Sequence, residues 1–308
     1  MKNKRDLKLN FLVQTVVAFL LTAVLAMLVV NSMMTGEVVY TSEPVKSVYI
    51  PPQPPPEVEP GPDSSGLKPF YIPAKIDIFQ FLLSFFIATS LMLLFLKKFK
   101  GKFLFEFFFS GAIIFGAQGP FGLFLSKLYA FLAAVLLVVF RFTHPRIWTQ
   151  NIIIIIGISG IAASLGASIN PVFALFILIL LSVYDVIAIY KTRHMVKLFK
   201  GMASRGAVLA LIIPKSFSLW KNKFDIIKAD NRKEFIFIGT GDIALPLFFA
   251  TAAFVDGVRF SIAIIIGAII GLIADHLVFV TQKEKKAIPA LPMIAFFSIA
   301  GYIIVSLI

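Results

Sequence analysis

The chain has 308 residues, of which 59% are hydrophobic and only 15% are charged. Because about a quarter of the residues in a soluble domain are charged, this composition excludes an ordinary soluble protein and indicates a polytopic membrane protein. The formal net charge of +13 comes from basic residues between apolar runs, where they orient membrane helices, so we expect no nucleic acid among the partners. The chain has no cysteine, which excludes disulfides and thiolate chemistry, and any catalysis must use oxygen groups.

The first apolar run covers residues 11–30 and follows the basic residues Lys2, Lys4, Arg5 and Lys8. Its length matches the roughly 20 residues that a spanning helix needs. A signal peptide begins in a similar way but has a shorter apolar core, so we expect a retained helix. Residues 31–77 are polar and contain a proline-rich run at 51–56, which is typical of an extended external linker.

From residue 78 to the end the sequence is almost entirely apolar, and basic, glycine or proline positions divide it into crossings. The 38 residues between Lys102 and Arg141 would span about 57 Å as one helix, which is close to two crossings. We expect that pair to break at Gly119-Pro120. The other expected crossings are residues 78–96, two between 146 and 191 with a break near 166–171, two after 233 with a break at 256–257, and one from about 288.

These nine crossings agree with the distribution of charge. If the N-terminus is cytoplasmic, the cytoplasmic segments hold 24 of the 29 basic residues, as the positive-inside rule requires. We therefore predict an all-α polytopic membrane protein with nine transmembrane helices, a cytoplasmic N-terminus and an external C-terminus. Its parts are residues 1–30 (basic head and first crossing), 31–77 (external linker), 78–190 (crossings two to six), 191–233 (basic cytoplasmic loop) and 234–308 (crossings seven to nine).

Two aspartates lie inside these apolar runs, in the settings Tyr184-Asp185 and Gly239-Thr240-Gly241-Asp242. An ionisable group in a spanning helix is costly and marks a functional site. Asp185 lies about 9 Å and Asp242 about 13 Å from the cytoplasmic ends of their runs, so the two share a membrane depth. Spacing alone leaves three possibilities open: two-carboxylate hydrolysis, ion or proton transport by a relay, and structural pairing.

The local motifs favour hydrolysis. Tyr184-Asp185 and Gly239-Thr240-Gly241-Asp242 resemble the YD and GxGD motifs of the presenilin and signal peptide peptidase family of intramembrane aspartyl proteases, and Pro289-Ala290-Leu291 resembles its PAL motif. The three occur in the correct order, on the sixth, seventh and ninth crossings. The resemblance, which is closest to compact archaeal presenilin homologues, implies a presenilin-like fold and endopeptidase activity within transmembrane segments.

The resemblance also implies roles for these residues. Asp185 and Asp242 would be the catalytic dyad that activates water, Tyr184, Gly239 and Gly241 would support it, and Pro289, Ala290 and Leu291 would shape the site and engage substrate. No metal or organic cofactor is required. Substrates would be transmembrane proteins or peptides with an external N-terminus, accessory subunits would not be needed, and the protein would lie in the cell membrane as a multi-pass protein. The alternative function is an ion or proton transporter or leak channel that uses the aspartates as a relay.

Three further features of the sequence carry expectations. Asp275, next to His276, lies at a similar depth, and we expect it to be paired with another polar group. Gly267-Ala268-Ile269-Ile270-Gly271 has the spacing of a close helix-packing face. The loop at residues 191–233 has 11 basic residues and an amphipathic stretch at 207–220, so we expect this loop to lie on the anionic inner leaflet.

Overall fold

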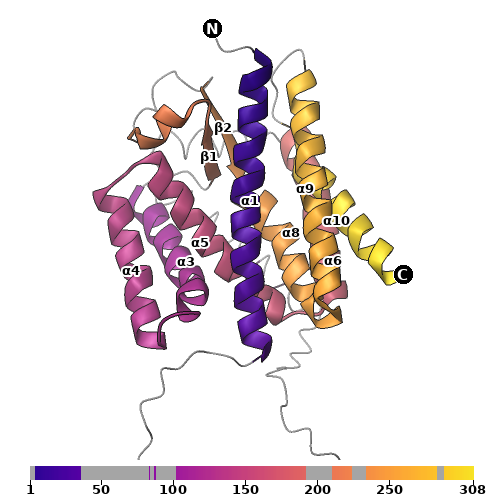
Figure 1. Cartoon of the computed structure of the whole chain (residues 1–308), viewed down its shortest axis with the longest axis horizontal. Coiled ribbons are helices and arrows are strands. Elements are labelled where there is room, and N and C mark those ends of the chain that lie inside the picture. Colours follow the sequence, from indigo (N-terminus) through magenta and orange to yellow (C-terminus); the bar gives the residue numbers. More distant parts are fainter. Residues whose placement is uncertain are drawn as a thin grey trace, which may run out of the picture.

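The computed structural model of the protein describes residues 4–35, 83, 87, 102–191, 210–223, 234–282 and 288–308. Its longest helix, α1 (Lys4–Thr35), stands in the middle of the molecule with helices on both sides (Figure 1). The expected second crossing, residues 78–96, lies outside the described residues except for positions 83 and 87.

The remaining helices form two groups, one on each side of α1 (Figure 1). The first group contains α3 (Lys102–Gly122), α4 (Lys127–Thr143) and α5 (Ile147–Ala167). The second contains α6 (Pro171–Val186), which continues as the π-helix η1 (Ile187–Lys191), then α8 (Thr240–Ala252), the 3₁₀-helix η5 (Ala253–Asp256), α9 (Val258–Thr281) and α10 (Leu291–Ser306).

Four helices of the described residues are long and apolar enough to cross a membrane: Leu9–Thr35, Ile147–Ala167, Pro171–Lys191 and Val258–Thr281. α10 is apolar but shorter. The fold is therefore mostly helical and typical of a membrane protein. The count of nine crossings and the orientation of the two termini stay predictions.

Local sequence explains where several helices begin. Asn170 caps α6, because its Oδ1 accepts a hydrogen bond from the backbone N–H of Val172 at 2.8 Å, and Pro171 occupies the first helical position, where no N–H is needed. Gly257 separates η5 from α9 with φ +122°, a conformation that side chains disfavour. Both breaks lie where the sequence predicts them.

The break predicted at Gly119-Pro120 is wrong, because α3 continues through Pro120 to Gly122. The reason is the packing of α3 against α5. A side chain at Gly160 of α5 would overlap the carbonyl oxygen of Gly116 and press on Cδ of Pro120. The close approach of the two helices supports the turn that proline would otherwise disrupt.

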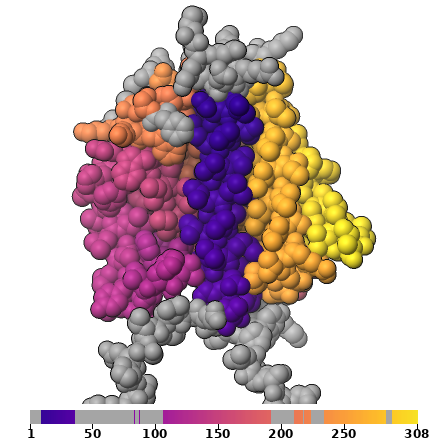
Figure 2. Space-filling view, viewed as in Figure 1, coloured from indigo at the N-terminus to yellow at the C-terminus, as the bar shows by residue number. Residues whose placement is uncertain are grey.

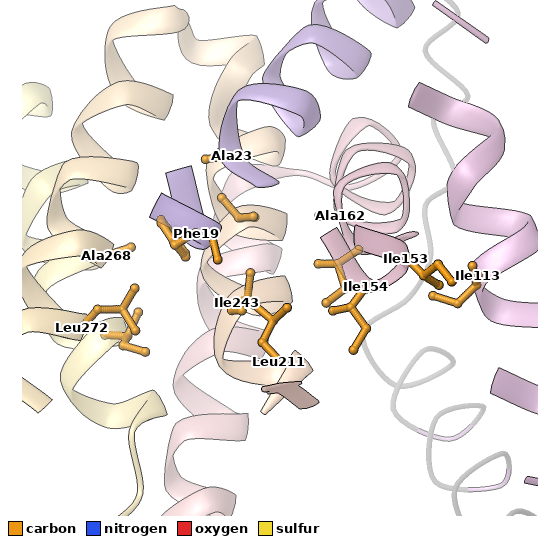
Figure 3. Packing of buried hydrophobic residues seen from close by; sticks show 14 of the residues in the cluster. Phe19, Ala23, Ile113, Ile153, Ile154, Ala162, Leu211, Ile243, Ala268 and Leu272 are labelled. Atoms are coloured by element: carbon orange, nitrogen blue, oxygen red, sulfur yellow. The ribbon is translucent and has the colours of Figure 1, made fainter. Parts of the chain in front are cut away.

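α1 joins the two groups of helices, and Figure 2 shows it exposed along one face between residues 102–167 and residues 240–308. Its opposite side is buried: Phe19 and Ala23 lie in one cluster with residues from α3, α4, α5, β1 (Ala210–Pro214), α8, α9 and α10, part of which Figure 3 shows. The labelled members are Ile113, Ile153, Ile154, Ala162, Leu211, Ile243, Ala268 and Leu272. The main core therefore lies against the inner side of the first helix.

α9 and α10 pack through glycines. A Cβ at Gly267 would overlap the backbone of Phe297, and one at Gly271 would lie 2.5 Å from Cα of Ile294. Gly301 of α10 meets the backbone of Ala263 in the same way. The close-packing face predicted from Gly267 and Gly271 is confirmed.

The sequence did not predict a two-stranded sheet. β1 (Ala210–Pro214) pairs antiparallel with β2 (Phe235–Gly239), from Ala210↔Gly239 to Pro214↔Phe235. All five residues of β1 are buried, so residues 210–214 form a buried strand and not part of a surface-bound amphipathic segment. For the rest of residues 191–233, the position on the inner leaflet stays a prediction. The helix expected from Lys233 instead begins at Thr240, because residues 235–239 form the second strand.

Candidate active site

Asp185 lies at the end of α6, where the helix changes from α to π geometry at Ile187. Its side chain is only 7% exposed and accepts a hydrogen bond from the backbone of Leu291. Leu291 is the first residue of α10, and N–H groups in the first turn of a helix have no partner within the helix. The aspartate therefore uses an unpaired backbone donor at the positive end of α10.

Asp242 is the third residue of α8, whose N-cap is Gly239. Its half-buried carboxylate accepts a hydrogen bond from the backbone of Gly239. This is the arrangement in which an acidic residue reaches back from the third helical position to the N-cap. A Cβ at position 239 would lie 3.0 Å from Oδ2 of Asp242, so the glycine leaves room for the carboxylate.

The structure brings the two acids together. Asp242 lies within electrostatic range of Asp185 and also of Asp275 of α9, and Asp275 lies within range of Asp185. Helices α6, α8 and α10 contact one another, so the backbone donor of Leu291 and both acids belong to one packed region. Each of the two acids is thus held at the N-terminus of a helix while it faces a like charge.

Asp275 is the acid whose role the sequence left open. Its Oδ1 is buried and accepts no hydrogen bond from the described residues, so the predicted pairing is not found for this oxygen. The charges acting on it include that of Asp185. Its depth, already visible in the sequence, was the signal that could have placed it beside the other two acids.

Tyr184, Gly239 and Gly241 differ in their surroundings. Tyr184 is 60% exposed and forms no side-chain hydrogen bond within the described part of the chain. A Cβ at Gly239 would lie 3.0 Å from Oδ2 of Asp242, whereas a Cβ at Gly241 would have no neighbour within 4 Å apart from the adjacent residues of the chain. The absence of a side chain therefore makes room for the carboxylate at Gly239.

The segment Pro289-Ala290-Leu291 leads into α10. Pro289 and Leu291 are buried, and Ala290 is the N-cap, whose carbonyl accepts the backbone N–H of Ile294 at 3.2 Å. Pro292 occupies the second helical position, where a missing N–H leaves no bond unmade. The segment thus places the N–H of Leu291 against Asp185.

Comparison with known proteins gives the family and the fold of the chain. A family model described as "Signal-peptide peptidase, presenilin aspartyl protease" matches residues 64–308. Two solved structures, described as a presenilin family intramembrane aspartate protease in the C222 and P2 space groups, share the fold with TM-scores of 0.56 and 0.58. They are 18% and 19% identical, and each alignment covers 95% of this chain and 96% of the other. No curated protein matches the chain. Because the family model covers most of the sequence, the chain belongs to the signal-peptide peptidase and presenilin family of aspartyl proteases.

Proposed function

We propose that the protein is an intramembrane-cleaving endopeptidase in which Asp185 and Asp242 activate water. Membership of a family of intramembrane aspartyl proteases supports the activity. The observation that carries the assignment of residues is that Asp185 and Asp242, in the YD and GxGD settings, lie within electrostatic range of each other on adjacent helices. The alternative of ion or proton relay explains the acids but not the family to which the chain belongs.

The chemistry follows from two carboxyl groups in one site. Two close carboxylates do not readily ionise together in a medium of low dielectric, so they titrate as a pair that shares one proton. The ionised member takes a proton from water as the water oxygen attacks the scissile carbonyl, and the protonated member polarises that carbonyl. Collapse of the tetrahedral intermediate returns a proton to the leaving amine. The backbone hydrogen bonds at Leu291 and Gly239 orient the two carboxylates for these steps.

The substrate must unwind before it can react. A transmembrane helix holds its carbonyl groups in its own hydrogen bonds, and the bilayer core supplies no water. We propose that an unwound segment of a transmembrane protein, with its N-terminus outside, reaches the acids near the cytoplasmic side of the cell membrane. An extended segment can pair with enzyme backbone as an added strand, and β2 leads directly to Asp242. A substrate complex with a fully helical cleavage region would contradict this form of binding.

The test uses purified protein, without accessory subunits, in liposomes that contain a single-span peptide. Mass spectrometry should detect peptides cut within the span, and Asp185→Ala and Asp242→Ala should each abolish them. Asp256→Asn provides the matched control and should retain cleavage. Asp256 lies in η5, beyond the opposite end of α8 from Asp242, and accepts a hydrogen bond from the hydroxyl of Tyr302. Cleavage that survives either alanine substitution would refute the assignment of the dyad.

A further inference from the structure

One edge of the small sheet is occupied by side chains. The backbone N–H of Lys215 donates to the carbonyl oxygen of Glu234 at 2.8 Å, so the backbone N–H and C=O groups of Lys215 face the chain that forms β2. Backbone groups of successive residues in an antiparallel strand face alternate sides. Ile212 and Pro214 therefore direct their backbone groups away from β2, toward α5 and α1.

Asn151 of α5 satisfies both outward groups of Ile212. Its Oδ1 accepts the N–H of Ile212 at 2.9 Å, and its Nδ2 donates to the carbonyl of Ile212 at 2.7 Å. The side chain is 2% exposed. An amide is the side-chain group that can accept and donate in this way at one residue, so Asn151 occupies the position that another strand would take.

Gln14 of α1 holds the end of the same strand. Its Nε2 donates to the carbonyl of Pro214 at 3.2 Å, and its Oε1 accepts the indole N–H of Trp220 at 3.0 Å. Pro214 has no N–H of its own, so this edge has no donor left at that residue. Gln14 is 9% exposed, and it joins the first helix to β1 and to the segment that follows.

β1 in turn pairs with the strand that leads into α8. Ile212 pairs with Phe237 of β2, and β2 ends at Gly239, the N-cap of α8. Asp242 lies three residues beyond the strand. β1 is therefore connected to Asp242 through its backbone pairing with β2 and through the first turn of α8.

We propose that Asn151 and Gln14 are positioning residues for Asp242: they fix β1 to α5 and α1, and through β2 they fix the first turn of α8. The inference rests on the proposed function, in which Asp242 is one of the two acids that activate water. Neither anchor needs to touch the substrate, because each acts through the backbone of β1.

The experiment compares Asn151→Leu with Gln150→Leu. Gln150 is an equally buried amide on the same helix. Its Oε1 accepts from Nε of Arg141 on α4, and among the described residues no hydrogen bond joins it to β1. Asn151→Leu should lower kcat by about 10- to 100-fold, the effect expected for a misplaced catalytic group, and change KM by less than about threefold. Hydrogen exchange of residues 210–214 and 235–239 should become faster. Gln150→Leu should leave kcat per folded molecule and the exchange of both strands close to wild type.

Trp220→Phe is a milder second variant, since it keeps an aromatic ring, although a smaller one, but removes the indole donor to Gln14. Like Asn151→Leu it should lower kcat, but only by about threefold, as expected for the loss of one hydrogen bond. If Asn151→Leu does not fold, the kcat and the hydrogen exchange of Trp220→Phe test the positioning role. Unchanged kcat and unchanged exchange, or a rise in KM alone, would overturn the inference.

The two proposals fail in different ways. If Asp242→Ala still cleaves the single-span peptide, the proposed function fails. If Asp242→Ala is inactive while Asn151→Leu keeps the wild-type kcat, only the positioning role fails.

Discussion

Replacing Gly271 of α9 by alanine should disturb the site through helix packing alone. A Cβ at this position would lie 2.5 Å from Cα of Ile294 and 2.9 Å from the carbonyl oxygen of Met293, whereas ordinary contacts begin at 3.4 Å. The obstructing atoms are backbone atoms, so α10 must move by about 0.9 Å, the difference between 3.4 and 2.5 Å. Ile294 lies three residues after Leu291, whose backbone binds Asp185, and the movement should therefore reach the site.

The magnitude follows from two opposing terms. Overpacking destabilises by about 1–3 kcal/mol, and glycine to alanine in a helix stabilises by roughly 0.5–1 kcal/mol. From the middle of each range, Gly271→Ala should lower the free energy of unfolding by about 1 kcal/mol, and by about 2.5 kcal/mol at most. A shift near 1 Å can reduce turnover by about 100-fold. Thermal unfolding in detergent and the kcat for the single-span peptide measure the two effects.

Gly111→Ala is the matched control. Gly111 lies inside α3, and a Cβ there has no neighbour within 4 Å. This variant should be more stable than wild type by roughly 0.5–1 kcal/mol and should cleave normally. If both alanine variants shift the unfolding midpoint equally and keep the wild-type kcat, the packing argument is refuted.

Two other substitutions test the core and the third acid. Phe19→Ala removes a fully buried ring from the core cluster and should lower the free energy of unfolding of the protein by about 3–5 kcal/mol. Leu20→Ala is the control, because that side chain is 39% exposed, and it should change the midpoint of thermal unfolding much less. Equal shifts of the midpoint in the two variants would contradict the role of the cluster. Asp275→Asn removes a like charge near Asp185 and Asp242, so it should raise the midpoint of thermal unfolding. The variant should keep at least about a tenth of the cleavage rate, since a group outside the reacting dyad contributes less to turnover. A loss as complete as that of the dyad variants would make Asp275 a catalytic group.

Short-range chemistry explains what was predictable in the fold. The break before α6 needs only Asn170 and Pro171, and the break before α9 needs only Gly257, because a helix cap is decided by a few consecutive residues. The packing of Gly267 and Gly271 follows in the same way from their spacing on one helix.

The sheet was not predictable by the same reasoning. Residues 210–214 are a short apolar run, whose periodicity does not distinguish a strand from part of a helix. Its identity as a strand comes from residues 235–239, from Asn151 and from Gln14, which are distant in the chain. Pro120 within α3 has the same cause, since the contact with Gly160 decides whether that helix continues.

The amino-acid sequence by itself determined that the protein belongs in a membrane and that Asp185 and Asp242 are the acids to consider. Only the tertiary structure decided what holds them: the backbone of Leu291 on Asp185, the backbone of Gly239 on Asp242, and Asp275 nearby. The physical reason is that these donors are main-chain N–H groups, which nearly every residue possesses. Residue type therefore carries no signal for them, and their position depends on how α8 and α10 begin.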